Sequence, residues 1–509
     1  MALTISLVPQ PVSIQYRQGL FQIKGLPPIQ GDEVFHREIQ VFKEQLQQNY
    51  GGIEAGAAAK IRCSKDLSLS PEAYRLSIEP ETINLYAACG SGIYHGLQTL
   101  RQLILSEYRD GLLPLPCVNI EDHPRFGWRG FMLDTSRHFY TPDCIKNLLD
   151  ALSLHHINRF HWHLTDDQGW RLPVPSYPLL TEIGSRRKNI KIPHHVYTGA
   201  GFYTEADIQD IVAYAQARHI EVIPEIDIPG HASAILACYP GLGCTGGPYQ
   251  VEDRYGIFED VLCAGNDAVF DFAAACFDAL VTLFPSQYVH IGGDEVWFNR
   301  WNNCPKCQKR LAETGLSTAR ELQSWITVKL AKMLADRGKT AIGWDEVLED
   351  TETYKLPKEV VVMSWRGSKG GIEASGLGHP VIMSPNSEGC YLDYKHYDAP
   401  EEPGNLGVST VYQTYTMDPI TPEMSNEAAA LILGGQCNLW SELIYADRIA
   451  EYMTFPRICA LSEGLWTPKE LKDFDGFAQR LEVHQKRLDQ MGLLQYRGYL
   501  GKTGKKRNN

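Results

Sequence analysis

The sequence predicts an α/β fold, a (β/α)8 TIM barrel preceded by a small α+β domain with an antiparallel sheet. The chain has 509 residues, enough for a barrel of about 250 residues or more and a second domain. Beyond residue 127, eight apolar, strand-like runs alternate with helical patterns. Polar side chains follow these runs, as they do on the active-site face of a barrel. A doubly wound open sheet is the alternative, but no GxGxxG segment follows a run to support it.

The first predicted domain comprises residues 1–122. Three of its segments alternate between apolar and polar residues as strands do, and two have the period of helices. A turn at Pro80–Glu81 separates the last two strands. The strands are Leu20–Lys24, Ala73–Ile78 and Thr82–Ala87, and the helices are Val34–Gln48 and Ile93–Leu105. The acidic stretch Glu121–Pro124 marks the boundary with the next domain.

The barrel is predicted over residues 123–466. Thr141 with Pro142 starts one helix, and Thr204 with Asp207 in capping-box position starts another. Further helices are expected at Ala268–Leu283, at Thr318–Arg337 and after Glu442. The strands are Trp128–Leu133, Arg159–His163, Glu221–Pro224, Tyr288–Ile291, Thr340–Trp344, Val360–Trp365, Val381–Ser384 and Ile432–Trp440.

Residues 467–509 form a C-terminal segment. Its helical pattern, Phe474–Met491, is expected to pack against the flank of the barrel. The basic residues Lys502, Lys505, Lys506 and Arg507 follow it and are interpreted as a solvated chain end.

Charge and cysteine content narrow the classes of partner and location. A net charge of −13 repels phosphate backbones and anionic lipid, so neither nucleic acid nor a membrane surface is an expected partner. The start of the chain lacks a basic region, and Pro9 and Pro11 interrupt its apolar stretch. The 13 cysteines, an odd number, indicate reduced thiols. We expect a cytoplasmic protein, or a secreted one if a leader has been removed.

Carboxylates and indoles recur where the predicted strands end. Because those ends meet at one rim of a barrel, their side chains face a common cavity. An indole packs on the apolar face of a sugar ring, while carboxylates and arginine bind its hydroxyls. The rim therefore favours a carbohydrate ligand.

The segment His290–Glu295, HIGGDE, is the most informative element. Its two glycines free the backbone where the strand ends, so that Asp294 and Glu295 can both reach the cavity. Adjacent carboxylates do not readily flank a glycosidic bond as separate acid and nucleophile about 5 Å apart. They suit a reaction in which the substrate supplies the nucleophile. The alternative is a structural pair in the first turn of a helix.

Seven motifs give the chain a resemblance to family 20 glycoside hydrolases, the β-N-acetylhexosaminidases of bacterial type. Residues before them resemble the family's accessory N-terminal domain more weakly. The motifs occur in family order and are WRGFMLDTSRHF at Trp128–Phe139, HWHLTDDQGWR at His161–Arg171, PEIDIPGH at Pro224–His231, HIGGDE at His290–Glu295, GWDE at Gly343–Glu346, YLDY at Tyr391–Tyr394 and LWSE at Leu439–Glu442.

The resemblance implies a role for each matching residue. Glu295 would be the general acid/base, Asp294 would hold the 2-acetamido N–H, and Tyr391 would bind the acetamido oxygen. The remaining implied substrate-binding and supporting residues are Trp344, Trp365 and Trp440 as walls, Arg129, Glu442 and Asp393 on the sugar hydroxyls, and His231, Asp227 and Asp166 around Glu295.

One loop departs from the family pattern. Many members carry another tryptophan before the eighth strand, whereas Val411–Pro419 reads VYQTYTMDP and has none. Tyr412, Tyr415 or Met417 is therefore expected to form that part of the pocket wall.

Several residues have a structural interpretation that competes with a functional one. His161, Asp166, Asp167 and His231 lack regular metal-ligand spacing, so no metal is expected. His163 is interpreted as a hydrogen-bonded core histidine, Trp128 and Trp162 as barrel packing, and Arg137 with His138 as a rim pair. Cys304 and Cys307 would be half of a zinc or redox site, but the second half is not recognisable, which favours a plain surface loop.

The predicted function is an exo-acting, retaining glycosidase without a cofactor. It would release terminal non-reducing β-linked GlcNAc or GalNAc from an oligosaccharide or glycoconjugate through an oxazolinium intermediate. The alternatives are a lacto-N-biosidase-like relative that releases a disaccharide and an inactive carbohydrate-binding protein. No motif specifies the aglycone, which depends on loops around Trp297, Trp301 and Tyr394, or the oligomeric state.

Overall fold

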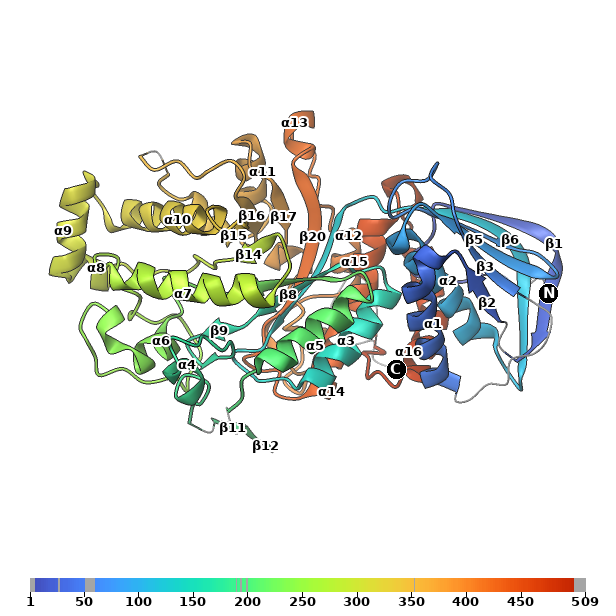
Figure 1. The fold of residues 1–509 in the computed structure, drawn as a ribbon, viewed down its shortest axis with the longest axis horizontal. Helices are drawn as coiled ribbons and strands as arrows, with labels where there is room; N and C mark the ends of the chain where they lie inside the picture. Colours follow the sequence, from blue (N-terminus) through green and yellow to red (C-terminus); the bar gives the residue numbers. More distant parts are fainter. Residues whose placement is uncertain are drawn as a thin grey trace.

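The computed structural model describes residues 5–25, 28–50, 60–188, 190–192, 195–197, 200–351 and 353–498. Two domains lie side by side, with the chain passing from a sheet-rich unit into a larger α/β unit (Figure 1). The predicted basic tail lies outside the described residues.

The N-terminal domain is a six-stranded sheet covered by helices. Its strand order is β1-β6-β4-β5-β3-β2. The strands are β1 (Ser13–Lys24), β2 (Ile29–Gly31), β3 (Lys60–Lys65), β4 (Tyr74–Ile78), β5 (Thr82–Ala87) and β6 (Leu112–Asp122), and the helices are α1 (His36–Tyr50) and α2 (Gly90–Glu107). Pairing is antiparallel from β1 to β5, and β3 and β2 join the β5 edge in parallel.

The larger domain is the predicted barrel, closed in the order β13-β14-β15-β16-β17-β20-β7-β8 with every pairing parallel. All eight expected strands are confirmed to within two residues. They are β7 (Trp128–Asp134), β8 (Arg159–His163), β13 (Glu221–Glu225), β14 (Tyr288–His290), β15 (Thr340–Trp344), β16 (Val361–Ser364), β17 (Val381–Met383) and β20 (Ile432–Leu439). Trp128, Ile223, Ile342, Met363 and Ile382 fill the interior.

Helices and short strand pairs surround the barrel. Thr141 caps α3, and Thr204 with Asp207 forms the expected capping box of α5. The helices are α3 (Pro142–Leu154), α4 (Leu179–Glu182), α5 (Glu205–Gln216), α6 (Ser233–Cys238), α7 (Ala268–Leu283), α8 (Asn299–Asn303), α9 (Pro305–Thr314), α10 (Ala319–Ala335), α11 (Lys369–Gly376), α12 (Val411–Thr416), α13 (Asn426–Ala429), α14 (Asp447–Thr454), α15 (Arg457–Trp466) and α16 (Phe474–Gln490). The short strands are β9 (Thr165–Asp166), β10 (Gly169–Trp170), β11 (Ile190–Ile192), β12 (His195–Tyr197), β18 (Tyr394–Lys395) and β19 (Asn405–Val408).

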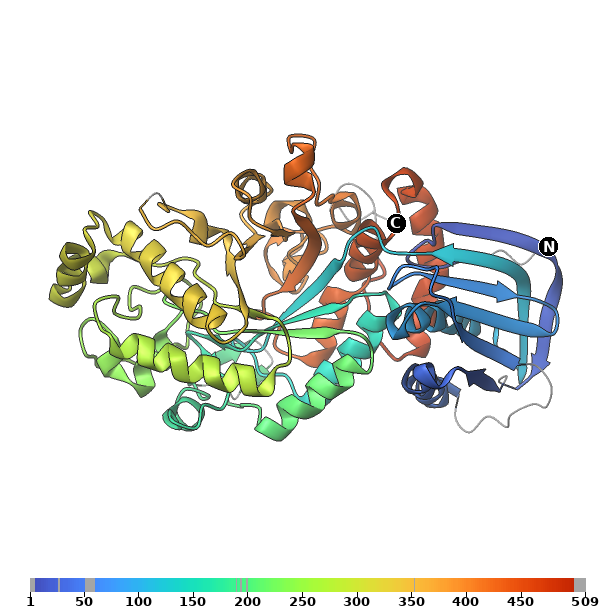
Figure 2. The same cartoon turned by 45° about the horizontal axis from the view of Figure 1, so that its top comes forward.

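The two domains meet through a buried polar seam. Trp466 Nε1 lies 3.0 Å from both carboxylate oxygens of Asp122, and burial raises the pKa of Asp122 to about 6. Helix α16 contacts α2 at this junction rather than only the flank of the barrel, and both helices lie between the sheet and the barrel (Figures 1 and 2).

Arg129 belongs to this seam, which corrects its predicted role in binding sugar. It is fully buried near the start of β7, at the amino ends of the strands. Its guanidinium donates to Glu72 at 2.6 Å and to the carbonyl oxygen of Phe126 at 2.7 Å. Because catalytic side chains of a barrel lie at the carboxyl ends, Arg129 joins the domains instead.

Within the described residues, none of the helices combines the length and apolar character needed to cross a membrane.

Candidate active site

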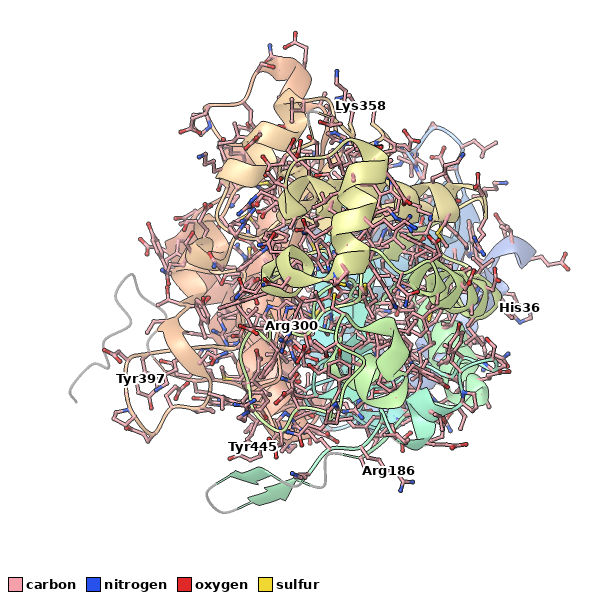
Figure 3. The ribbon with its side chains drawn as sticks, turned by 90° about the vertical axis from the view of Figure 1, so that its left-hand side faces the viewer. His36, Arg186, Arg300, Lys358, Tyr397 and Tyr445 are labelled. Atoms are coloured by element: carbon pink, nitrogen blue, oxygen red, sulfur yellow. The ribbon has the colours of Figure 1, made fainter. Side chains whose placement is uncertain are left out.

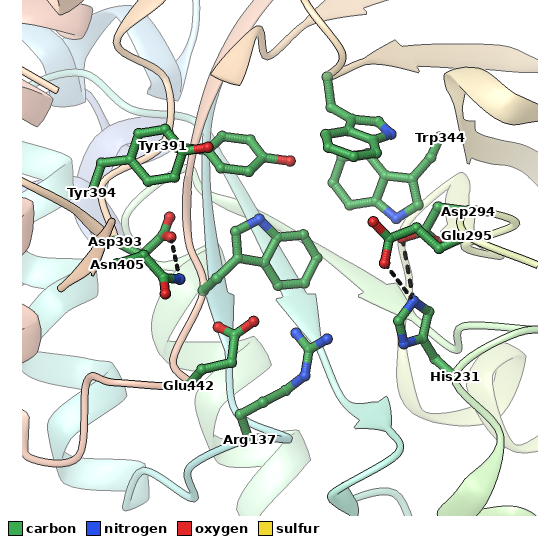
Figure 4. A pocket seen from close by; sticks show the side chains of 12 residues that line it. Arg137, His231, Asp294, Glu295, Trp344, Tyr391, Asp393, Tyr394, Asn405 and Glu442 are labelled. Carbon is green, nitrogen blue, oxygen red and sulfur yellow. Dashed lines mark hydrogen bonds and ion pairs between the residues drawn. The ribbon is translucent and has the colours of Figure 1, made fainter. Parts of the chain in front are cut away.

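A cavity opens where the barrel strands end (Figure 4). Its volume is about 580 Å³ when the space open to solvent at its mouth is included. Most of its lining side chains are carboxylates and aromatic rings. They are Arg137, His231, Asp294, Glu295, Trp344, Trp365, Tyr391, Asp393, Tyr394, Asn405, Trp440 and Glu442.

The turn after β14 aims two adjacent carboxylates at this cavity. Gly292 and Gly293 have φ of +68° and +94°, and Glu295 itself has φ of +50°. A Cβ on Gly292 would lie 1.7 Å from Oδ1 of Asp227. That oxygen accepts a hydrogen bond from the Gly293 N–H at 3.2 Å. The Asp227 carboxylate thus holds the glycine turn from behind, and only glycine permits the close approach.

His231 lies between the acidic pair and two further carboxylates. Its Nε2 is 3.5 Å from Glu295 and 3.7 Å from Asp294, while its Nδ1 is 3.2 Å from Asp166 and 3.1 Å from Asp167. Burial alone would lower the pKa of His231, but Asp166 and its neighbours raise it well above its usual value. A protonated His231 therefore orients Glu295 and partly offsets the surrounding negative charge.

Asp294 is buried beside Asp227, and this position favours the protonated form of its carboxyl group. Burial raises the pKa of Asp294 well above its usual value, and the Asp227 carboxylate adds to the effect. Its Oδ1 has no hydrogen-bond partner among the described residues. A cationic or N–H-bearing group placed against this oxygen would supply the missing partner and favour the ionised form.

Aromatic rings form the cavity walls. Trp344 and Trp440 have ring centroids 5.7 Å apart, and Tyr391 is stacked on Trp365 with an interplanar angle of 14°. The Trp344 Nε1–H donates to Glu225 at 3.0 Å, which fixes that ring. The walls offer flat apolar faces to the apolar side of a pyranose.

Across the cavity from Glu295, two carboxylates and Arg137 form a polar end (Figure 4). Oε2 of Glu442 and Oδ1 of Asp393 are buried and have no hydrogen-bond partner within the described part of the chain. The other Asp393 oxygen accepts from Asn405 Nδ2 at 3.0 Å. Burial, helped by Glu442, raises the pKa of Asp393 to about 7. Buried acceptors left open in this way are suited to ligand hydroxyls.

A network of buried histidines and carboxylates supports the cavity floor. The carboxylate oxygens of Glu225 lie 2.9 Å from His161 Nε2 and 3.0 Å from His290 Nδ1. His163 also bonds Glu225 and joins it to Asp166 at 2.9 Å. His163 is thus hydrogen-bonded and buried, as expected, although it links site residues rather than standing alone.

Most predicted site residues meet at the cavity. Asp294, Glu295, Tyr391, His231, Trp344, Trp365, Asp393, Trp440 and Glu442 line it. Asp227 and Asp166 lie behind the lining, where Asp166 holds Arg137 at 2.7 Å and His231. Asp166, expected among the residues around Glu295, acts on the cavity through these two side chains.

Arg137 occupies the position that Arg129 was expected to fill. It lines the cavity at the end of β7, with its guanidinium 5.1 Å from the Trp440 ring centroid. The sequence signal that could have found Arg137 is its place three residues after Asp134, the last residue of β7. Asn405 was missed because it begins the short strand β19, which no sequence motif marks.

The replacement for the family's loop tryptophan was also predicted wrongly. Tyr415 and Met417 are buried in the protein core, and Tyr412 packs on Phe474. None of the three lines the cavity. Helix α12 carries Tyr412 and Tyr415 towards α16, so Tyr394 and Asn405 complete the wall instead.

Cys304 and Cys307 are likewise not a surface loop. Both are buried, and each lies near other cysteine sulfurs.

Comparison with known proteins gives two family matches that together span most of the chain. Residues 126–469 match the glycosyl hydrolase family 20 catalytic domain, and residues 4–123 match domain 2 of the same family. The chain belongs to glycosyl hydrolase family 20. A β-hexosaminidase of Porphyromonas gingivalis is 42% identical over 88% of this chain, which spans 57% of that relative's length. A β-hexosaminidase of Vibrio furnissii is 34% identical, with 91% of this chain and 76% of the relative covered.

Solved structures of family 20 members share the whole fold. The exo-β-N-acetylglucosaminidase of Vibrio harveyi, in complex with N-acetylglucosamine, matches with a TM-score of 0.88 and 31% identity, covering 98% of this chain and 80% of that one. A β-N-acetylhexosaminidase of Bacteroides fragilis matches with a TM-score of 0.84 and 31% identity, covering 96% of both chains.

Proposed function

We propose that this family 20 chain is an exo-acting, retaining β-N-acetylhexosaminidase. It releases terminal β-linked GlcNAc or GalNAc from the non-reducing end of an oligosaccharide or glycoconjugate. The observation that carries the proposal is a set of three buried carboxylate oxygens around one aromatic cavity, on Asp294, Asp393 and Glu442, that have no hydrogen-bond partner among the residues the structure describes. An acetamido N–H and two hydroxyl groups of one sugar would satisfy them.

The cavity orients the sugar from end to end. Glu442 and Asp393 lie at the end opposite Glu295 (Figure 4). The O3, O4 and O6 side of the terminal ring therefore binds there, and its C1 faces Glu295. A closed polar end of this kind accommodates the last residue of a chain, which favours exo cleavage. Release of a disaccharide would need room beyond these carboxylates.

The reaction uses the substrate's own acetamido oxygen as nucleophile. Glu295 protonates the glycosidic oxygen, and the acetamido oxygen attacks C1 to form an oxazolinium ion. Asp294 holds the acetamido N–H and stabilises the positive charge that develops there, while Tyr391 donates a hydrogen bond to the attacking oxygen. Glu295 then removes a proton from a water molecule as that water attacks C1. This opens the oxazolinium ring and leaves the configuration at C1 retained overall.

A panel of chromogenic substrates tests the proposal. p-Nitrophenyl β-N-acetylglucosaminide and the galactosaminide should be hydrolysed, and the matching glucoside and galactoside should be nearly inert because they lack the nucleophile. Release of lacto-N-biose from its p-nitrophenyl glycoside would favour the disaccharide-releasing alternative. Failure to turn over any substrate, with binding of N-acetylglucosamine retained, would favour the binding protein.

We also propose a cytoplasmic location. Support comes from the 13 cysteines, none of which is in a disulfide, since a reducing compartment keeps cysteines in that state. Fractionation of the native host, with the activity followed in each fraction, tests it.

A further inference from the structure

Four cysteine side chains converge in one place, on the far side of the barrel from the N-terminal domain. Cys244 and Cys263 come from the segment between β13 and α7, residues 226–267. Cys304 and Cys307 come from the segment between β14 and α10, residues 291–318. Their sulfur atoms all lie within 4.8 Å of one another. We propose that these four thiolates bind one Zn²⁺ ion that clamps the two segments together.

The sulfur separations match tetrahedral zinc coordination. Sγ of Cys263 lies 3.7 Å from that of Cys304 and 3.6 Å from that of Cys307, and Cys244 lies 3.8 Å from Cys307. Sulfurs placed about 2.3 Å from zinc at tetrahedral angles are about 3.8 Å apart. A disulfide needs about 2.05 Å. The four sulfurs therefore have the spacing of a metal's ligands and not of bonded pairs.

The backbone around the sulfurs is built for thiolates. Gly265 follows Cys263 by two residues and packs directly on the backbone of Lys306 and Cys307. Helix α9 begins at Pro305, so its positive amino end faces Cys304 and Cys307. A Cβ on Gly265 would lie 2.1 Å from the Lys306 carbonyl carbon. The chain thus brings the C-A-G and C-P-K-C turns into direct contact, which requires glycine at 265.

The donor set favours zinc over other biological cations. Tetrahedral four-sulfur sites select zinc or iron, whereas calcium and magnesium require oxygen ligands. Three of the four cysteines are buried, and Cys244 is half-buried at the edge of a surface cavity lined also by Glu259 and Asn299. That edge gives the metal an entry path. Closed four-ligand sites of this type are structural, so the metal takes no part in hydrolysis.

The clamp acts on the two segments that carry the acid/base machinery. His231 and Asp227 belong to the first segment, and Asp294 and Glu295 belong to the second. Next to Cys263, the Leu262 N–H donates to the Pro229 carbonyl at 3.0 Å, and Trp301 Nε1 donates to the Leu262 carbonyl at 2.9 Å. Arg300, on α8 and labelled near the middle of Figure 3, pairs with Asp260 at 2.7 Å. The zinc ion adds to these contacts by holding the outer parts of the two segments together.

Metal analysis of the purified chain tests the proposal without relying on activity. The protein is expressed in defined medium with zinc and purified without a metal-affinity column. Mass spectrometry of the metals should find one zinc per chain, and a mercurial reagent that blocks thiolates should release it. Metal-free protein, iron in place of zinc, or disulfides among these cysteines would overturn the assignment.

Variants locate the ion. Cys304→Ser with Cys307→Ser should reduce bound zinc to near zero and lower the Tm. Cys276→Ser, at an equally buried cysteine on α7 outside the cluster, should retain one zinc per chain. Zinc retained by the double variant would contradict the site.

A second measurement covers the case in which the double variant does not fold. Wild-type protein grown with Co²⁺ should show the intense visible absorption of tetrahedral thiolate-bound cobalt. Its absence from cobalt-loaded protein would overturn the proposal.

Discussion

At the scale of single residues, the geometry of the site depends on positions where close neighbours restrict which residue type fits. Gly292 faces the Asp227 carboxylate at a distance that excludes a side chain, and its φ of +68° adds to that requirement. Asp294, Asp393 and Glu442 each present to the cavity one buried oxygen that no group among the described residues satisfies. These oxygens are therefore placed to accept hydrogen bonds from a ligand.

Gly292→Ala should disable the site while the barrel still folds. The new methyl group would displace Asp227 and tilt the turn that carries Asp294 and Glu295, so kcat/KM should fall by about 10²-fold or more. Gly127→Ala is the control, because a Cβ there meets nothing within 4 Å. Kinetics with the chromogenic glucosaminide compare the two variants. An equal, small effect in both would contradict the packing argument.

Glu295→Gln should reveal the proton that Glu295 transfers. For substrates with poor leaving groups we expect kcat to fall by about 10²–10⁴-fold, and much less for p-nitrophenolate or a better leaving group, which needs no proton. Rates on an N,N′-diacetylchitobiose-type substrate and on the chromogenic one give the comparison. An equal loss on both would show that Glu295 is not the acid.

Asp393→Asn should stabilise the free protein at neutral pH. Burial raises the pKa of Asp393 to about 7, whereas an unfolded chain has about 3.8, so the folded state holds the extra proton between these values. The contribution of Asp393 to stability therefore declines as pH rises from about 4 to 7. The variant should gain about 4 kcal/mol at pH 8 and nothing near pH 4, while losing activity.

Denaturant unfolding at the two pH values checks this difference. Asp336→Asn, at a side chain that is 64% exposed, serves as the control. A gain that is the same at both pH values would refute the assignment to Asp393.

At the scale of elements, the sequence was most informative where a pattern is local. Period, caps and turns lie within about ten residues, and they located all eight barrel strands and the caps at Thr141 and Thr204. Strand β3 was missed because its residues, KIRCSK, alternate weakly and depend on pairing with β5. Strand β6 was missed because Pro114 and Pro116 mask its pattern.

The candidate site was predictable to a similar extent and for a similar reason. Carboxylates and indoles next to strand ends were found by position alone. Two features were not predicted because they depend on strand register or on residues far apart in the sequence. One is which end of β7 carries the arginine of the cavity. The other is that Cys244 and Cys263 meet Cys304 and Cys307, which follow about 40 to 60 residues further along the chain.

Strand β7 offers a direct test, because its two ends carry arginines with different duties. Arg137→Ala should lower kcat/KM by about 10²-fold, since Arg137 lines the cavity and contacts Asp166. Arg129→Ala should instead lower the Tm, because Glu72 loses its buried partner. Its kcat/KM on folded protein should stay within about threefold. Thermal unfolding and steady-state kinetics measure both effects in both variants. A large loss of kcat/KM in Arg129→Ala, together with a lower Tm but unchanged kcat/KM in Arg137→Ala, would contradict the account.

At the scale of the whole molecule, the interface with the N-terminal domain and the candidate active site lie at opposite ends of the barrel. The N-terminal domain packs at the amino ends of the strands through Glu72, Asp122 and Trp466, and none of the residues that line the cavity comes from it. At the carboxyl ends, the long segments after β13 and β14 carry Asp227, His231, Asp294 and Glu295, and the four cysteine sulfurs of the proposed zinc site come together from these two segments. The barrel thus holds the site between two supports.

The central claim is that the substrate's acetamido oxygen, and no carboxylate of the protein, attacks C1. The most direct measurement is kcat/KM for p-nitrophenyl glucosaminides whose N-acetyl group carries zero, one, two or three fluorine atoms. Each fluorine weakens the acetamido oxygen as a nucleophile, so the account predicts a steep, progressive fall of about 10²-fold or more across the series. Nearly equal rates across the series would show that the acetamido group is not the nucleophile and would contradict the mechanism.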